Sequence, residues 1–191
     1  MFTTTILTDP RPVAAVTDHG DTGSVFTVHG TKKFLDRVPD KVIPPPDLQP
    51  ATTVLGGWYV TVLFWAPQVA LFVNEPTRLP LFVPLAPGGS VITRMTQSAA
   101  LVFTELGLPD TLVSHEVAEM DSHQVTKTAS RSVLGTMNDF TYLAEAHRAP
   151  KASTDLVELS LRLAQTPCRP LYHSHISPDR EIIAYLAGHS R

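Results

Sequence analysis

The sequence predicts an α+β fold in which a small antiparallel sheet packs against several helices. Three apolar runs between residues 58 and 85 follow one another through short connections, which is the pattern of a three-strand antiparallel meander. Most of the chain after residue 90 instead has apolar residues at helical spacing. Hydrophobic residues make up 43% of the 191 positions and charged residues 17%, a composition typical of globular proteins. We expect one or two further strands beside the meander.

Length, charge and cysteine content limit the class of protein. The chain has the length of one domain, which we place at residues 25–187, between a loose N-terminal lead-in over 1–24 and a tail over 188–191. The net charge of −3 argues against a protein that coats nucleic acid regardless of sequence, because such proteins carry a basic field. The single cysteine cannot form an internal disulfide, and the N-terminus lacks the long apolar region of a secretory signal. We therefore expect a cytoplasmic protein.

The N-terminal part contains one strand, one short helix and a proline-rich connector. Alternating polar and apolar residues predict the strand over residues 25–29. Thr31 can cap a helix over residues 31–38. Residues 39–50 contain a run of prolines, which lack the backbone N–H and favour extended geometry, so we expect a stiff connector. This connector is a candidate boundary between a small N-terminal unit and the main body.

The predicted meander consists of three runs, at residues 58–65, 69–74 and 79–85. The first two form the most apolar stretch of the chain. Pro67 and Gln68 divide this stretch, and it is shorter than the roughly 20 residues of a membrane helix, so we predict two buried strands and no membrane span. Pro80 and Pro84 cannot donate hydrogen bonds to a neighbouring strand, so the third run should lie at an edge of the sheet.

After residue 90 the pattern predicts helices, with one further strand among them. The expected helices cover residues 90–106, 110–120, 132–147 and 154–165, and a last one begins at Ser177. Ser90 and Asp110 are the expected caps of the first two. The further strand covers residues 123–128. Because the helix over 154–165 is apolar on more than half of its circumference, we expect it to lie between two packing surfaces.

The segment TASRSVLGTMNDF, at the start of the longest predicted helix, combines an apolar side with a concentrated polar face. On a helical wheel the core side consists of Val133, Met137, Phe140 and Ala144. The opposite sector consists of Arg131, Gly135, Asn138 and Tyr142, with Ser132 and Asp139 together on one flank. A solvated helix back is the simpler explanation. However, a glycine inside a helix costs about 1 kcal/mol relative to alanine, which favours close approach by a ligand or another backbone.

The chemistry of this face suits an anion. Arg131 and Ser132 lie near the helix N-terminus, where free backbone N–H groups attract a phosphate or a carboxylate. Glu75 of this chain would satisfy the same geometry. If the face is a site, Asn138 would orient a substrate, and Asp139 or Glu75 would be the acid–base group.

Other residues are weaker candidates. Tyr142 shares the polar face, and Lys33 opposes the dipole of its short helix unless an anion lies nearby, so both are candidates for substrate binding. Glu75 and Arg78 lie in the turn NEPTR, where a surface ion pair is the simpler explanation.

The segment YHSHIS places two histidines, at 173 and 175, at alternate positions. Zinc sites usually need three or four protein ligands, so we expect no metal here and no cofactor elsewhere. The phosphate-loop, dinucleotide, serine-hydrolase and paired CxxC motifs are absent from the sequence.

Several segments together resemble a family of short bacterial proteins of unknown function. They are TKK near residue 31, GWY, NEPTRLPLFVPL, TASRSVLGTMNDF, and LSLRLAQTPCRPLY followed by SPDR; the string SRSVLGTMNDF is the most specific. The likeness covers residues 25–187. It implies a bacterial, cytoplasmic protein, with members on chromosomes and on mobile elements. It draws attention to Arg131, Ser132, Asn138 and Asp139 but supplies no activity.

Three hypotheses for function follow. The first is a small enzyme or toxin-like protein, of the kind found in toxin–antitoxin systems, that acts on a phosphate-bearing substrate such as a nucleotide or RNA. The second is a binding or adaptor module without chemistry, which would use the edge strand over residues 79–85 and the polar helix face. The third is structural: the polar face forms an internal hydrogen-bond network that clamps the long helix onto the sheet.

Overall fold

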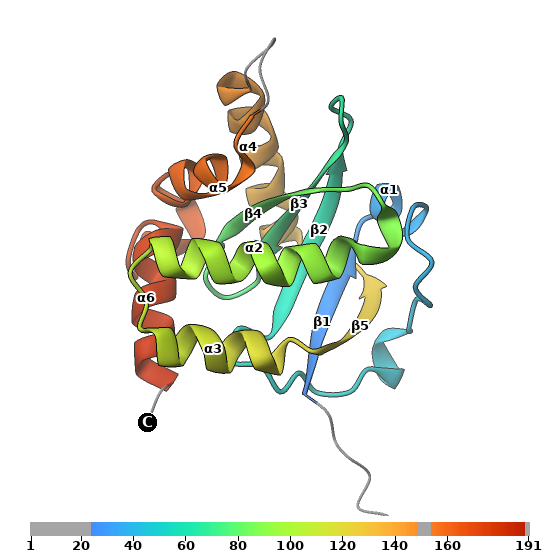
Figure 1. The fold of residues 1–191 in the computed structure, drawn as a ribbon, viewed down its shortest axis with the longest axis horizontal. Coiled ribbons are helices and arrows are strands. Elements are labelled where there is room, and N and C mark those ends of the chain that lie inside the picture. The colour runs from blue at the N-terminus through green and yellow to red at the C-terminus, as the bar shows by residue number, and fades with distance from the viewer. Residues whose placement is uncertain (1–23, 149–153, 190–191) are drawn as a thin grey trace, which may run out of the picture.

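One five-stranded sheet organises the chain, in the computed structural model that describes residues 24–148 and 154–189 (Figure 1). The predicted α+β class is confirmed. The strand order across the sheet is β4-β3-β2-β1-β5. The strands are β1 (Val25–Gly30), β2 (Gly57–Leu63), β3 (Val69–Asn74), β4 (Pro80–Pro84) and β5 (Ser122–Lys127).

The sheet is mixed, and the prediction of a purely antiparallel sheet was wrong. Strands β2, β3 and β4 form the expected antiparallel meander. Strand β1, however, pairs parallel with both β2 and β5. The reason lies in the connections, because parallel neighbours need a long crossover that returns the chain to the same end of the sheet. The connector after β1 and the two helices before β5 provide these crossovers.

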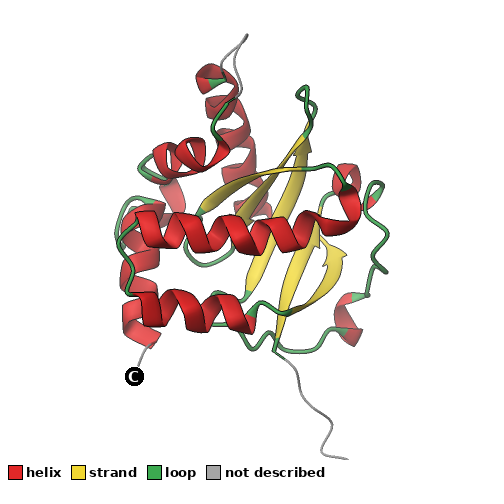
Figure 2. Cartoon of the chain, in the orientation of Figure 1, coloured by secondary structure: helices red, strands yellow, loops and turns green. Residues whose placement is uncertain are grey.

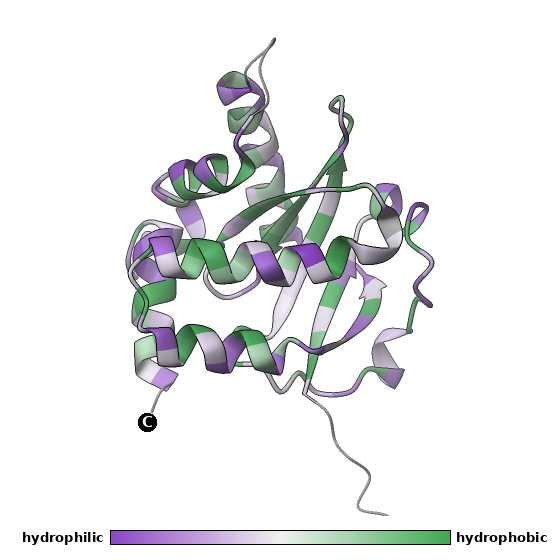
Figure 3. Cartoon of the chain, in the orientation of Figure 1, coloured by the Kyte–Doolittle hydropathy of each residue, from purple (hydrophilic) through white to green (hydrophobic). Residues whose placement is uncertain are grey.

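Helices cover both faces of the sheet. They are α1 (Lys32–Leu35), α2 (Val91–Glu105), α3 (Asp110–Glu119), α4 (Arg131–His147), α5 (Leu156–Ala164) and α6 (Pro178–His189). Figures 1 and 2 show α2 and α3 side by side in front of the sheet, with α4 behind it. In Figure 3 the hydrophobic segments run along the strands and alternate with hydrophilic ones along the helices. None of the helices in the described ranges is long and apolar enough to span a membrane.

The buried hydrophobic residues form two cores, one beneath α2 and α3 and one beneath α4. Helix α5 packs against both of them, as its broad apolar surface predicts. Leu159 and Leu163 pack in the core beneath α4, while Val157, Leu161 and Ala164 pack in the core beneath α2 and α3. The helix therefore contacts β4 and closes the gap between the two helical layers at that end of the sheet.

Strand β4 is an edge strand, as its prolines predict, but its outer edge is covered. The Phe82 N–H points away from β3 and donates to Ser160 Oγ of α5 at 2.9 Å. Because backbone groups alternate along a strand, Pro80 and Pro84 face the same way and have no N–H to offer. Arg94 of α2 donates to the carbonyl oxygens of Pro84 (3.0 Å) and Leu85 (2.8 Å). Within β4 as described, no free outward N–H remains for a docking strand.

The proline-rich connector covers the opposite edge of the sheet. The Ile43 N–H donates to the Val125 carbonyl at 2.7 Å, and Thr126 Oγ1 donates to the Ile43 carbonyl at 2.7 Å. Gln124 Nε2 donates to the Gln49 carbonyl at 2.6 Å. The connector is therefore tied to β5 at Ile43 and Gln49.

A buried asparagine fixes the turn between β3 and β4. Asn74 has no exposed surface. Its Nδ2 donates to the carbonyl oxygens of Leu55 (2.9 Å) and Gly57 (3.2 Å). Its Oδ1 accepts from the backbone N–H (3.1 Å) and the hydroxyl (2.8 Å) of Thr77. One side chain thus joins the start of β2 to the turn that follows β3.

A buried glutamate fixes the segment before β2. Glu116 of α3 is 2% exposed, and its carboxylate accepts from the backbone N–H groups of Val54 (3.2 Å) and Leu55 (2.9 Å). Burial raises the pKa of this carboxyl; the two backbone donors oppose the shift. Of the charged neighbours, His115 lowers the pKa and Glu119 raises it.

We expect Asn74→Ala to destabilise the fold by at least about 2 kcal/mol, because it leaves several buried groups without partners. Denaturant unfolding with Asn138→Ala as the matched control tests this. Asn138 is exposed on α4, so its substitution should change the free energy of unfolding by less than about 0.5 kcal/mol. Equal effects of the two substitutions would contradict the role given to Asn74.

We expect the wild type to lose stability relative to Glu116→Gln as the pH rises above 4.5, the ordinary pKa of glutamate. In this window the folded state holds the Glu116 proton more tightly than the unfolded state. Its stabilising contribution is therefore present at low pH and is lost as the pH rises through the elevated pKa. Parallel denaturation of the two proteins between pH 4 and pH 8 measures the difference. A difference that stays constant with pH would refute the assignment.

Candidate functional site

The turn after β3 carries two charged residues in a fixed geometry. The Asn74 N–H donates to the Leu79 carbonyl at 3.0 Å, and the Arg78 N–H donates to the Asn74 carbonyl at 3.1 Å. Arg78 has a φ of 61°, in the left-handed region that side-chain-bearing residues rarely adopt. The turn thereby presents Glu75 and Arg78 beside the first turn of α4.

The N-terminus of α4 contacts this turn. Ser130 caps the helix, and its Oγ accepts from the Val133 N–H at 3.4 Å. The Ser130 N–H donates to the hydroxyl of Tyr59 at 3.2 Å. Two residues further, in the first turn of the helix, Ser132 Oγ lies 3.5 Å from Arg78 Nη2, which donates to it. The helix end that attracts anions therefore lies next to a guanidinium.

The Arg78 guanidinium is incompletely paired. Its Nε and Nη1 are buried and donate to no acceptor among the described residues. Burial lowers the pKa of Arg78, and the negative charge of Glu75 opposes that effect. Since arginine stays protonated in proteins, a positive charge with unused donors remains at this point. Such a group favours an anion with several acceptor oxygens.

Glu75, Tyr59 and His29 form the second part of the cluster. The Tyr59 hydroxyl donates to Glu75 Oε1 at 3.4 Å. The rings of His29 and Tyr59 stack with centroids 4.4 Å apart and 14° between their planes. Burial lowers the pKa of His29, although the Lys127 carbonyl and the charge of Glu75 oppose this, so the ring is mostly neutral at pH 7. Burial and the Glu75 charge raise the pKa of Tyr59.

Gly57 makes room for this arrangement. A β-carbon at Gly57 would lie 2.9 Å from Glu75 Oε2 and 3.3 Å from His29 Nε2. The first distance is too short for any real contact, so a side chain here would displace the carboxylate. The glycine therefore allows Glu75 and His29 to approach the same point above β2.

Cys168 lies at the border of the cluster. Its Sγ is 3.8 Å from Thr136 Oγ1 of α4. Burial raises the pKa of the thiol, Arg78 lowers it, and the charge of Asp139 raises it. The Cys168 N–H donates to the carbonyl of Ile176, which has a φ of 72°. Both non-glycine residues with a left-handed backbone among those described therefore flank this site, and such strain is concentrated at functional sites.

The structure brings some of the predicted site residues together. Glu75 and Ser132 belong to the cluster around Arg78. The charge of Asp139 raises the pKa of Cys168, which lies at the border of this cluster. Arg131, Asn138 and Tyr142 are exposed on the outer face of α4.

Gly135, Asn138 and Lys33 were also singled out from the sequence, and the structure shows their surroundings. A β-carbon at Gly135 would meet nothing within 4 Å, so no close approach within the described chain explains this glycine. The exposure of Asn138 argues against the internal clamp. Lys33 lies on α1 with its Nζ 5.6 Å from the centre of the Phe64 ring.

Sequence reasoning missed His29 and Tyr59 and undervalued Arg78. His29 and Tyr59 are adjacent only because β1 and β2 pair in parallel with these residues opposite each other. The spacing of Glu75 and Arg78 within one turn was the only local signal. It indicated a surface ion pair, whereas the structure gives a guanidinium with buried nitrogens.

The two histidines of the C-terminal segment do not form a metal site with their neighbours. His175 Nδ1 lies 3.0 Å from Glu181 Oε2, which also accepts from the Ser174 hydroxyl. Within residues 24–148 and 154–189, no group of three or more histidine, cysteine or acidic side chains is arranged to hold a metal ion.

Comparison with known proteins gives one match. The family model of a domain of unknown function, DUF6933, matches residues 27–181. No curated protein and no solved structure matches this chain. The matched range begins within β1 and ends in the first turn of α6, so it includes the whole cluster around Arg78. The chain belongs to the DUF6933 family.

Proposed function

We propose that this protein is a small enzyme or toxin-like protein that acts on a phosphate-bearing substrate, a nucleotide or RNA. The observation that carries the proposal is the Arg78 guanidinium, whose buried Nε and Nη1 lack acceptors among the described residues. The adjacent N-terminus of α4 adds backbone donors and a favourable dipole for the same anion. A phosphate at the helix end would reach the guanidinium through Nη2, the nitrogen that faces Ser132.

The acid–base groups stand beside the proposed phosphate position. Glu75 is the principal candidate, because Tyr59 orients it and Arg78 lies in the same turn. The neutral His29 ring supplies a second proton acceptor near Glu75. Asp139 is the alternative acid–base residue. Arg131, Asn138 and Tyr142 would contact parts of the substrate beyond the phosphate, and Lys33 would contribute only to a substrate that reaches α1.

A binding module without chemistry is the second candidate. The exposed face of α4 favours it, because Tyr142 is 78% exposed and Gly135 has open space above it. A partner would use this helix face. The covered outer edge of β4 leaves the edge strand over residues 79–85 without the backbone donors that strand addition needs.

We expect Arg78→Lys to weaken binding of adenosine monophosphate by roughly 10- to 100-fold. The lysine keeps the charge but loses the planar fork, and charged hydrogen bonds contribute about 1.5–3 kcal/mol. Isothermal titration calorimetry of wild type, Arg78→Lys and the control Arg180→Lys, an exposed arginine of α6 outside the proposed site, measures this. The control should change the affinity by less than about threefold. Failure of the wild type to bind either the nucleotide or inorganic phosphate would refute phosphate recognition.

We expect Glu75→Gln to reduce hydrolysis of RNA or nucleotide phosphoesters by about 10²- to 10⁴-fold, the usual contribution of a general acid or base. The amide keeps the shape and the hydrogen bond from Tyr59 but cannot take a proton. Asp139→Asn, assayed beside it, distinguishes the two carboxylates. If expression of the wild type leaves growth, RNA and nucleotide pools unchanged while the purified protein still binds phosphate, the binding module replaces the enzyme.

A further inference from the structure

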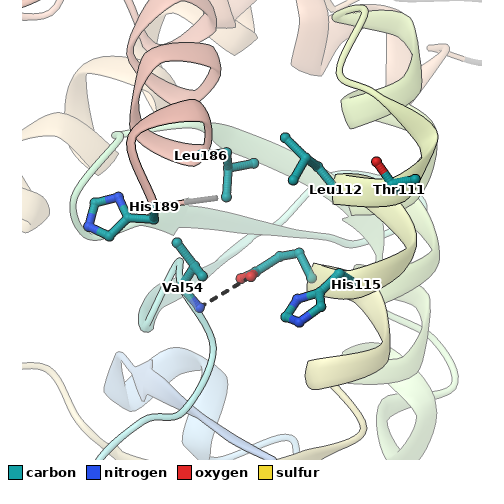
Figure 4. Close-up of a pocket in the computed structure, with 7 residues that line it drawn as sticks. Val54, Thr111, Leu112, His115, Leu186 and His189 are labelled. Carbon is teal, nitrogen blue, oxygen red and sulfur yellow. Dashed lines mark hydrogen bonds between the residues drawn. The ribbon is translucent and has the colours of Figure 1, made fainter. Parts of the chain in front are cut away.

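A pocket lies on the opposite helical layer, away from α4. It has a volume of about 270 Å³ and opens between the segment before β2, helix α3 and helix α6. Figure 4 shows His189 on one side of the pocket and His115 on the other, with Leu186 and Leu112 above them in this view. Its lining consists of Val54, Thr111, Leu112, His115, Glu116, Leu186 and His189.

A buried carboxylate lines this pocket. Glu116 is 2% exposed and accepts the two backbone N–H groups of Val54 and Leu55. An ionised carboxylate has about four acceptor positions, so these bonds leave part of its capacity unused. No cationic side chain within the described residues forms an ion pair with it. Among its charged neighbours, His115 lowers the pKa of Glu116 but forms no ion pair with it, so a bound cation would supply the missing countercharge.

Two of the other polar residues of the pocket, His189 and Thr111, can also accept hydrogen bonds. The His189 ring lies with Nδ1 2.7 Å from the Tyr185 carbonyl, which places the proton of the neutral ring on Nδ1. Nε2 then carries a lone pair. The hydroxyl of Thr111 can accept as well. Val54, Leu112 and Leu186 supply apolar walls between these groups.

We propose that this pocket binds a small organic ammonium ion with an apolar body. An ammonium group carries the charge that Glu116 lacks and three donors for the surrounding acceptors. The apolar walls fit a short hydrocarbon or aromatic body. The volume lies just below the usual range for ligand sites, which limits the ligand to roughly ten non-hydrogen atoms. An anion would be repelled by Glu116, and a neutral hydrocarbon would leave its charge unpaired.

Benzylamine is the probe for this pocket, and benzyl alcohol is its neutral counterpart of the same size. We expect saturable benzylamine binding by calorimetry, with shifts of the Val54 and Leu55 amide signals in NMR spectra. Benzyl alcohol should bind at least tenfold more weakly. Glu116→Gln should weaken benzylamine at least tenfold and leave benzyl alcohol unchanged, because glutamine keeps an acceptor for the backbone but no charge.

Two further variants control the experiment. Glu105→Gln removes an exposed carboxylate from α2 and should not alter benzylamine binding. Thr111→Trp places a large ring at an exposed position of the pocket lining and should abolish binding without unfolding the chain, whether or not Glu116→Gln folds. Equal affinity for the amine and the alcohol, or wild-type affinity in Thr111→Trp, would overturn the proposal. Neither outcome bears on phosphate binding at Arg78.

Discussion

The four hydrogen bonds of the Asn74 side chain are the constraint on which the proposed site depends. They join the start of β2 to the turn after β3, and the asparagine that makes them has no exposed surface. Because the turn cannot relax, Arg78 is held in a left-handed backbone conformation. The packing and hydrogen bonds of the whole turn offset the free-energy cost of that backbone conformation. The residue that carries the guanidinium is therefore fixed before any ligand binds.

Preorganisation of this kind matters for binding an anion. A flexible surface arginine loses side-chain entropy when it grips a phosphate, whereas a guanidinium that is already held loses little. Shifted pKa values keep two neighbouring side chains uncharged. His29 is kept neutral by burial and Tyr59 is kept protonated by burial and by Glu75. A negative carboxylate, a neutral ring and a positive guanidinium therefore occupy one small region in distinct protonation states.

Much of the fold could be predicted from the sequence because it rests on local patterns. The meander, the edge position of β4 and the contacts of α5 on two sides follow from apolar period and from proline chemistry. The parallel pairing of β1 could not be predicted, because short apolar runs do not encode their neighbours. The site was predicted only in part for the same reason. Local patterns led to the prediction of Glu75 and Ser132 as site residues, but the stacking of His29 on Tyr59 depends on strand register.

The covered sheet edges have a consequence for how this chain behaves among other proteins. At the β4 edge, two prolines lack an N–H and Ser160 of α5 accepts the remaining outward N–H. The β5 edge is hydrogen-bonded to the connector, so neither edge favours pairing with a strand of another protein. The folded chain is therefore protected against edge-to-edge aggregation. The covered edges do not depend on the surface residues of α4. Substitutions that make this helix face more apolar would therefore not extend the sheet with foreign strands.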